Sequence, residues 1–151
     1  MVKVLIVDDS VFMRTIIRDM LAKESSIEIV GTASNGLDAL EKIQELNPDL
    51  ITLDIEMPKM NGLEVLLELK KIKKHPKVLM LSSLTSKDAE MTHEAIRRGA
   101  DDFMLKPKDL PHIREISEEL ISKVKHLVTL TRSEIHHKPL PSHGSNADRV
   151  V

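Results

Sequence analysis

Short apolar runs alternate along the chain with longer stretches in which apolar residues recur every three or four positions. The short runs are Lys3–Val7, Ile27–Thr32, Leu50–Leu53, Val78–Leu81 and Asp102–Leu105. Several of them consist almost entirely of Val, Ile and Leu, which is typical of parallel strands buried on both faces of a sheet. The pattern therefore predicts five β-strands, several of them buried on both faces.

Helical spacing occupies the stretches between the predicted strands. Ser10 is a suitable N-cap for a first helix, and Asn35-Gly36 opens a second that stops before Pro48. The later helices are expected from Gly62 to His75-Pro76, from Thr85 to a C-terminal Gly99, and from about Pro111 to Val128. The apolar positions expected to face the sheet are Phe12, Met13, Ile16, Ile17, Met20 and Leu21 in the first helix, Leu37, Leu40, Ile43 and Leu46 in the second, and a series from Ile113 in the fifth.

Five strands that alternate with five helices on short links predict an α/β fold, a parallel sheet covered on both faces. Right-handed crossover connections leave only a few doubly wound arrangements for such a sheet. In these arrangements a ligand site lies beyond the carboxyl ends of the strands. The polar residues that follow the strands are therefore the first candidates for a function.

The helical pattern stops near Thr131 and does not return. We expect residues 1–125 to form one domain, since single domains commonly contain about 100–150 residues. Residues 126–151 are expected to contain the end of the fifth helix and then an interdomain linker or flexible tail, because this segment is rich in polar residues and proline. Its histidines, among them His136, His137 and His143, are expected to be solvated.

Composition and charge exclude several other functions. The net charge of -2, from 22 basic and 24 acidic residues, gives no general attraction to nucleic acid or to an anionic membrane. Phe12 and Phe103 are the only aromatic residues, too few for a base-stacking surface, and the absence of cysteine excludes a disulfide framework. No apolar stretch reaches the roughly 20 residues that span a bilayer, and the start lacks a signal-peptide core. We therefore expect a cytoplasmic protein without nucleic-acid binding or membrane insertion.

Acidic residues follow two of the predicted strands. Asp8-Asp9 follows the first strand and Asp54 follows the third, so their carboxylates should meet at one edge of the sheet. Like charges at such short range raise one another's pKa, and a divalent cation relieves the repulsion. Oxygen ligands facing solvent suit Mg²⁺, for which Mn²⁺ can substitute. The sequence therefore predicts a magnesium site at Asp8, Asp9 and Asp54.

A lysine and a serine follow two further strands and should lie at the same edge. Lys106 comes after the fifth run and precedes Pro107, and Ser82 comes after the fourth. An ammonium group at this place could pair with Asp54 or with a phosphoryl oxygen bound to it. A metal, a cation, a hydroxyl and a nucleophilic carboxylate are together suited to phosphoryl transfer. Asp54 would then be the catalytic nucleophile that forms an acyl phosphate, with Lys106 and Ser82 assisting.

Each of these residues also has a purely structural interpretation. Asp8-Asp9 could simply favour the start of the first helix, and Asp54 could be a turn residue. Lys106 could be an ordinary solvated lysine. Their combined occurrence at equivalent strand ends favours the functional interpretation.

The roles of a serine and an aromatic residue stay open at this point. Ser82 or Ser83 could cap the fourth helix, and either could be the hydroxyl of the site. Phe103 could contribute only to core packing, as buried aromatic residues commonly do.

At these positions the chain resembles the response-regulator receiver domains of two-component signalling. The matching segments are Val7-Asp8-Asp9-Ser10, Leu53-Asp54-Ile55-Glu56-Met57-Pro58 with Gly62, Ser82, and Lys106-Pro107. The resemblance covers roughly residues 1–125 and implies a flavodoxin-like, doubly wound five-stranded parallel sheet in the order 2-1-3-4-5. It implies that Asp54 accepts phosphate from a histidine kinase or a small phosphodonor, with the Glu56 backbone carbonyl as a further metal ligand. It also implies that Ser82 and Phe103 are switch residues, Ser82 moving toward the phosphoryl group and Phe103 changing rotamer.

Further details are similar to the receiver of the chemotaxis protein-glutamate methylesterase. They are Thr52–Pro58, Asn61-Gly62-Leu63-Glu64 and Met80–Thr85. That family adds a C-terminal esterase domain after a linker and acts on chemoreceptors, so the resemblance implies a chemotaxis histidine kinase and those partners. This sequence ends in linker-like residues, so we expect a regulatory domain with self-phosphorylation and self-dephosphorylation only. The full-length parent would be the methylesterase and deamidase hydrolase.

Two alternatives stay open beside this subtype. One is a free-standing chemotaxis receiver that docks on a separate partner. The other is a phosphatase with an aspartyl nucleophile; such enzymes generally carry a second Asp two residues later, where this chain has Glu56.

Overall fold

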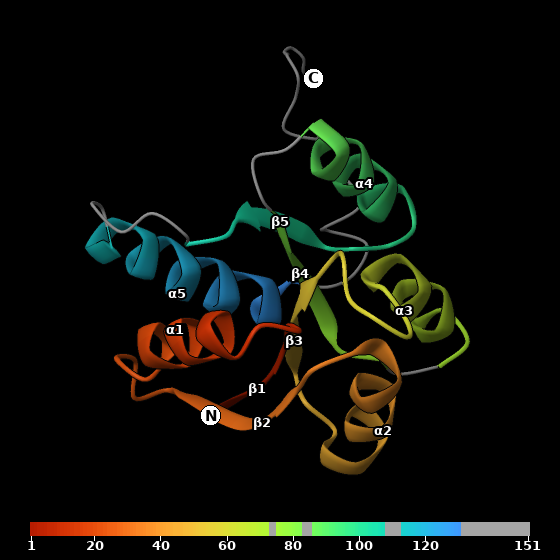
Figure 1. The fold of residues 1–151 in the computed structure, drawn as a ribbon. Helices are drawn as coiled ribbons and strands as arrows, with labels where there is room; N and C mark the ends of the chain where they lie inside the picture. Colours follow the sequence, from red (N-terminus) through yellow and green to blue (C-terminus); the bar gives the residue numbers. More distant parts are fainter. Residues whose placement is uncertain (73–74, 83–85, 108–112, 131–151) are drawn as a thin grey trace.

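A single five-stranded parallel sheet forms the centre of the protein in the computed structural model, which describes residues 1–72, 75–82, 86–107 and 113–130 (Figure 1). The strands are β1 (Val2–Val7), β2 (Ile27–Ala33), β3 (Leu50–Asp54), β4 (Lys77–Ser82) and β5 (Asp102–Leu105). Their order across the sheet is β2-β1-β3-β4-β5. The predicted doubly wound α/β fold and its strand order are confirmed.

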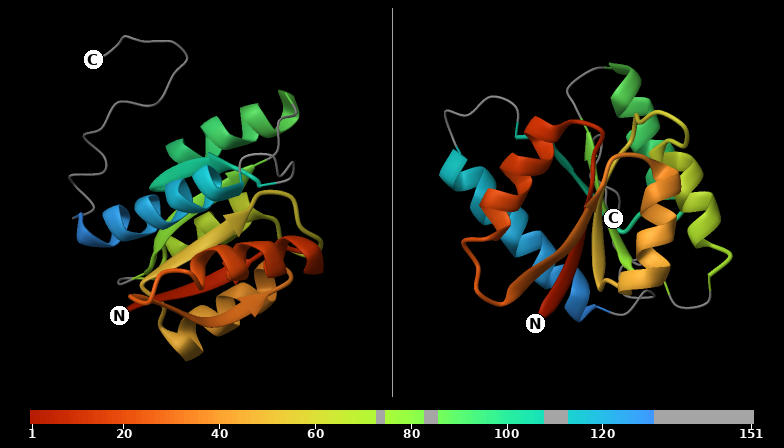
Figure 2. Two further views of the ribbon diagram at one scale, coloured as in Figure 1. Left: turned by 90° about the vertical axis from the view of Figure 1, so that its left-hand side faces the viewer. Right: turned by 60° about the horizontal axis from the view of Figure 1, so that its bottom comes forward.

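Five helices cover the two faces of this sheet. They are α1 (Val11–Leu21), α2 (Gly36–Leu46), α3 (Gly62–Leu69), α4 (Ser86–Arg97) and α5 (Ile113–Thr129). The helices α1 and α5 lie on one face, and α2, α3 and α4 lie on the other (Figures 1 and 2). Within the described ranges, none of these helices combines the length and apolar character needed to cross a bilayer.

Alternating strand residues contribute to two separate core layers. Ile6 and Leu79 pack with α1 and α5, whereas Leu53 and Met80 pack with α2, α3 and α4. The central strand β3 is buried along its whole length, as a parallel strand covered on both faces should be. The outer strands β2 and β5 are only partly buried.

The helix ends confirm most of the predicted capping residues. Ser10 Oγ accepts a hydrogen bond from Met13 N at 3.2 Å, and Asn35 caps α2 in the same way. Gly99 follows α4 with a φ of 111°, and the N–H of the next residue, Ala100, reaches back to Ala95 O at 2.9 Å. This is the glycine-terminated helix end expected from the sequence. The predicted starts at Thr85 and Pro111 lie outside the described residues.

The predicted end of the third helix was wrong. The helix was expected to continue to His75-Pro76, but α3 ends at Leu69. The N–H of Lys71 donates to Glu68 O and that of Ile72 to Leu69 O, so the backbone tightens into three-residue turns after the helix. Ile72 still packs against the core layer on this face, which explains its apolar character.

Three apolar residues expected to face the sheet are instead exposed. Phe12 in α1 is 63% exposed, Leu37 in α2 is 53% exposed and Ile113 in α5 is 39% exposed. All three lie in the first turn of their helices. In α2 the buried face is formed by Gly36, Ala39 and Ile43, because small residues let the helix approach closely.

The C-terminal end of α5 is tied to the start of β4. Lys77 Nζ donates to Leu127 O at 3.0 Å and to Leu130 O at 2.5 Å. Leu127 lies in the last turn of the helix, and Leu130 directly follows the helix. Leu127 O also accepts a backbone hydrogen bond from Leu130 N at 3.3 Å. The lysine therefore fixes the point at which the chain leaves the described domain.

Candidate functional site

Parallel pairing aligns the residues that follow the strands at one edge of the sheet. Val7 of β1 pairs with Leu53 of β3, so the residues that follow them, Asp8 and Asp54, are neighbours. Asp54 also pairs with Leu81 of β4, which places it at the middle of the sheet edge. The switch point between β1 and β3 is where doubly wound folds bind ligands.

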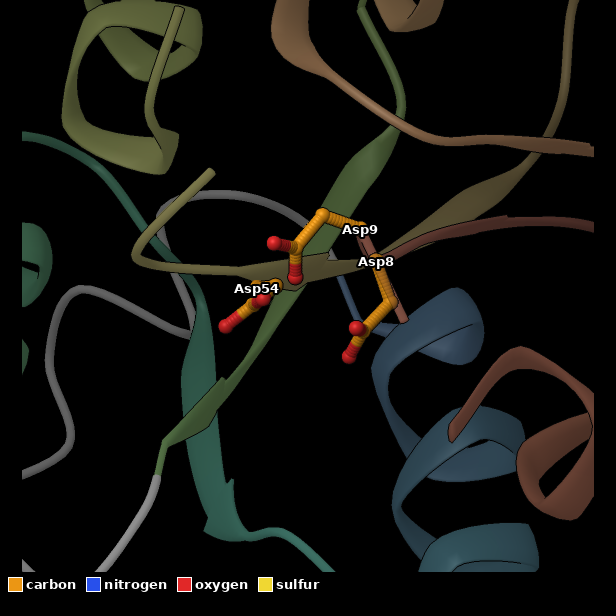
Figure 3. Close-up of side chains that lie close together, drawn as sticks. All are labelled: Asp8, Asp9 and Asp54. Atoms are coloured by element: carbon orange, nitrogen blue, oxygen red, sulfur yellow. The ribbon is translucent and has the colours of Figure 1, made fainter. Parts of the chain in front are cut away.

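The three predicted carboxylates are brought together. Asp8, Asp9 and Asp54 each place an oxygen within 4.8 Å of an oxygen of the other two. Figure 3 shows Asp8 and Asp9 extending from one strand end and Asp54 from the next. Asp8 and Asp54 are buried, whereas Asp9 is exposed and gives the cluster access to solvent.

Lys106 reaches the same cluster from the end of β5. Its Nζ lies 2.9 Å from Asp54 Oδ1 and 3.4 Å from Asp8 Oδ2, and its side chain is 13% exposed. The backbone N–H of Lys106 donates to Ser82 O at 2.8 Å, which fixes the lysine beside the end of β4. The structure thus places Asp8, Asp9, Asp54 and Lys106 in one site.

Asp8 is held by its own turn and by an arginine that the sequence interpretation missed. Ser10 N donates to Asp8 Oδ1 at 2.9 Å, a local turn that Asp commonly forms two residues ahead of an N–H. Arg14 of α1 donates through its guanidinium to Asp8 O at 2.6 Å. The one sequence signal for this contact is the position of Arg14, which lies about one turn into a helix that begins next to the site. In the described part of the chain Asp8 Oδ2 has no hydrogen-bond partner.

The electrostatics of the site favour protonation of the acids when no cation besides Lys106 is present. Burial, and then the charge of Asp8, raises the pKa of Asp54 to about 7 against the opposing effect of Lys106. Burial likewise raises the pKa of Asp8. Burial lowers the pKa of Lys106, but its hydrogen bond and ion pairs with Asp54 and Asp8 outweigh this, so that the pKa is raised overall. The lysine therefore stays charged while the carboxylates repel one another.

The loop from β3 to α3 is closed tightly beneath Asp54. The N–H of Gly62 donates to Ile55 O at 2.7 Å, and a Cβ at position 62 would lie only 2.5 Å from Asp54 O. Only glycine permits this approach, which gives Gly62 a role beyond helix punctuation. Glu56 lies in this loop with an exposed side chain, and the role of its carbonyl stays a prediction.

The two candidate switch residues lie on β4 and β5. Ser82 is the last residue of β4 and is buried, next to Lys106 in the backbone pairing. Phe103 pairs with Met80 and packs, half-buried, against the core layer of α2, α3 and α4. These positions are compatible with either a switching or a packing role, and Ser83, the alternative hydroxyl, lies outside the described residues.

The donor set at this edge fits a hard divalent cation. Asp8, Asp9 and Asp54 supply only oxygen, and Asp9 leaves one side open to solvent, as suits an ion that keeps several waters. Among the described residues, the buried Asp8 Oδ2 has no hydrogen bond, and its charged neighbour is the Lys106 ammonium at 3.4 Å. A divalent cation would contact this oxygen directly and relieve the repulsion among the carboxylates.

Comparison with known proteins gives consistent results. The sequence model of the response regulator receiver domain family matches residues 4–118. A protein-glutamate methylesterase/protein-glutamine glutaminase from Methanospirillum hungatei is 55% identical over all 151 residues of this chain, which cover 43% of that protein. One from Thermotoga maritima is 42% identical over 91% of this chain and 40% of its own length. The chain thus spans less than half the length of these relatives.

Solved structures agree with the sequence comparisons. The response regulator domain of Thermotoga maritima CheB has 43% identity and a TM-score of 0.75, covering 86% of this chain and 98% of that one. A chain of the CheX–CheY–BeF3–Mg complex from Borrelia burgdorferi has 32% identity and a TM-score of 0.67, covering 81% of this chain and 88% of that one. From its fold, its acidic site and these matches, the chain belongs to the response regulator receiver domain family.

Proposed function

We propose that this chain is a phosphorylation-activated receiver in which Asp54 accepts a phosphoryl group from a histidine kinase. The observation that carries the proposal is the convergence of three carboxylates and one lysine at the switch point of the sheet. When an aspartate accepts a phosphoryl group, neutralising the negative charge of the phosphoryl oxygens contributes more to catalysis than proton transfer does. The site supplies that neutralisation through Lys106.

Asp54 attacks phosphorus in its ionised form. A bond forms between an Asp54 oxygen and phosphorus while the P–N bond of the phosphohistidine breaks, and the imidazole nitrogen keeps the electron pair and takes up a proton. Lys106, 2.9 Å from Asp54 Oδ1, stays charged and offsets the negative charge of the incoming group. Later attack by water on phosphorus restores the carboxylate and releases inorganic phosphate.

The proposed cofactor is Mg²⁺, with Mn²⁺ as a substitute. Asp8, Asp9 and Asp54 would hold it together with the backbone carbonyl of Glu56. When bound, the ion would balance the charge on the phosphoryl oxygens. Support comes from the donor set and from the similar Borrelia burgdorferi structure, whose complex contains Mg²⁺ and BeF3.

The switch would begin at the edge of β4 and β5. Ser82 would move toward the phosphoryl group and Phe103 would change rotamer beneath the outer surface of α4, β5 and α5. The backbone hydrogen bond from Lys106 N to Ser82 O supports a joint response of these two residues. It links the end of β4 to the residue that follows β5, and both residues would contact the phosphoryl group.

The proposed effector is a protein-glutamate methylesterase, attached to this receiver or separate from it. We assign the receiver to residues 1–125 and residues 126–151 to the end of α5 and an interdomain linker. The relatives named above support this assignment, because the chain spans only 43% and 40% of their lengths. A chemotaxis histidine kinase would be the phosphodonor, and chemoreceptors would be the substrates of the effector. A protein that works with this kinase and these chemoreceptors would act in the cytoplasm.

The experiment that tests the proposal is phosphoryl incorporation measured by intact-protein mass spectrometry. The protein is incubated with acetyl phosphate and Mg²⁺, and then compared with Asp54→Asn and with Asp19→Asn, which removes an exposed carboxyl from α1. We expect the wild type and Asp19→Asn to gain the mass of one phosphoryl group and Asp54→Asn to gain none. Equal incorporation by Asp54→Asn would refute Asp54 as the acceptor.

A further inference from the structure

We propose that Gly36, the first residue of α2, is a positioning residue for the metal-binding edge of the site. The helix α2 contains none of the residues assigned to the site so far. The inference rests on the proposed function, because it concerns how the loop that carries Glu56 is held next to Asp54. It assigns α2 a role in metal affinity.

The contact between α2 and the loop is too close for any side chain at position 36. The N–H of Gly36 donates to Met60 O at 3.0 Å. A Cβ at this position would lie 2.5 Å from Met60 O and 2.7 Å from Met60 Cβ, closer than carbon atoms approach without displacement. Because one of these atoms is backbone, a rotamer change cannot relieve the overlap.

The loop has little freedom to absorb such a displacement locally. It contains only residues 55–61, and its two ends are joined by the hydrogen bond from Gly62 N to Ile55 O at 2.7 Å. Near its tip, Met60 N donates to Pro58 O at 2.7 Å, and Lys59 has a positive φ of 67°. A shift of Met60 is therefore passed along the short loop to Glu56 and to Asp54, whose carbonyl contacts Gly62.

The helix cannot move away in place of the loop. Its first turn is fixed by Asn35, whose side chain accepts from Asp38 N at 2.9 Å. Ala39 and Ile43, on the same face as Gly36, are buried against the sheet. The helices α2 and α3 lie on the same face of the sheet, and the loop joins β3 to α3 beside the start of α2 (Figure 1). Added volume at position 36 is therefore expected to displace the loop.

Gly36→Ala tests this inference, with Gly31→Ala as the matched control. A Cβ at Gly31 would lie 2.9 Å from Leu46 Cδ1, the end of a flexible side chain of α2 that can move aside, and no atom of the loop is among its nearest neighbours. The affinity for Mg²⁺ is measured by calorimetry and by amide NMR shifts, since the chain has no Trp or Tyr for intrinsic fluorescence. We expect Gly36→Ala to weaken Mg²⁺ binding roughly 10- to 100-fold, as loss of outer supports of a metal site does. Gly31→Ala should keep the wild-type affinity.

The outcomes separate this inference from the proposed function. If the wild type binds no Mg²⁺, the metal site itself is wrong; if it binds and Gly36→Ala matches it, the role of Gly36 is wrong. If Gly36→Ala does not fold, amide hydrogen exchange of the wild type decides. Mg²⁺ should then slow exchange at the Gly36 amide and leave the amide of Gly31 unchanged, and equal behaviour of both amides would overturn the inference.

Discussion

At the scale of single residues, Asp54 carries a free-energy cost when the protein lacks metal. Its pKa is raised to about 7 by burial and by the charge of Asp8, whereas an Asp in an unfolded chain has a pKa of about 3.9. Between these values the folded state binds more protons than the unfolded state, so the free energy of unfolding falls as pH rises. The loss is complete above pH 7 and amounts to at most about 4 kcal/mol, at 1.36 kcal/mol per pKa unit.

The variant Asp54→Asn should remove most of this pH dependence. We expect its free energy of unfolding to change less than that of the wild type between about pH 4 and pH 7 and to exceed it above pH 7. Urea unfolding at a series of pH values, with a chelator present, measures the difference. Asp19→Asn should retain the wild-type profile. A wild-type slope in Asp54→Asn would show that another group causes the pH dependence.

At the scale of elements, the end of α4 depends on one backbone conformation. Gly99 has a φ of 111°, and a Cβ there would meet nothing closer than Lys70 Cε at 3.7 Å. Gly99→Ala should therefore destabilise the protein through backbone strain alone, by about 1–2 kcal/mol. Gly99→Asn should cost less, because Asn tolerates left-handed conformations better. Equal stability of Gly99→Ala and the wild type in urea would contradict this account.

The elements themselves could largely be predicted from sequence, because buried parallel strands are nearly continuous in apolar residues. The strand limits differ from those expected by at most one residue at each end. Burial within the first helical turns could not be predicted, and Phe12 and Leu37 are exposed although they fit an apolar periodicity. Periodicity identifies a helix face but does not tell which of its residues the rest of the fold covers.

The acidic site could be predicted for a similar reason. In a parallel sheet, residues at the ends of adjacent strands are neighbours, so Asp8, Asp54 and Lys106 meet whenever the strand order is correct. Supporting contacts could not be predicted, because they do not follow from the pairing of adjacent strands. The hydrogen bonds from Gly36 to Met60, at 3.0 Å, and from Arg14 to Asp8, at 2.6 Å, depend on how a helix packs beside a loop or a strand end, which no sequence pattern records.

At the scale of the whole molecule, the affinity of the site for Mg²⁺ should be visible as stability. A ligand that binds only the folded state raises its stability by about 2.7 kcal/mol at a concentration of 100 times its Kd. We expect saturating Mg²⁺ to raise the melting temperature by several degrees at pH 8 and a chelator to reverse the effect. Asp8→Asn, which removes one buried ligand charge, should reduce the response. Equal stabilisation of Asp8→Asn and the wild type would place the ion elsewhere.

The hydrogen bonds from Lys77 to the end of α5 fix where a C-terminal extension is attached to the domain. Lys77 is the first residue of β4, while Ser82 is its last, so the tail joins one end of that strand and the acidic residues gather at the other. These ends are about 16 Å apart at 3.3 Å per residue. A protein joined through the tail therefore cannot sense the acidic edge at its own attachment point. To respond to phosphorylation, it has either to reach the acidic edge from that starting point or to respond to a change that passes along the domain.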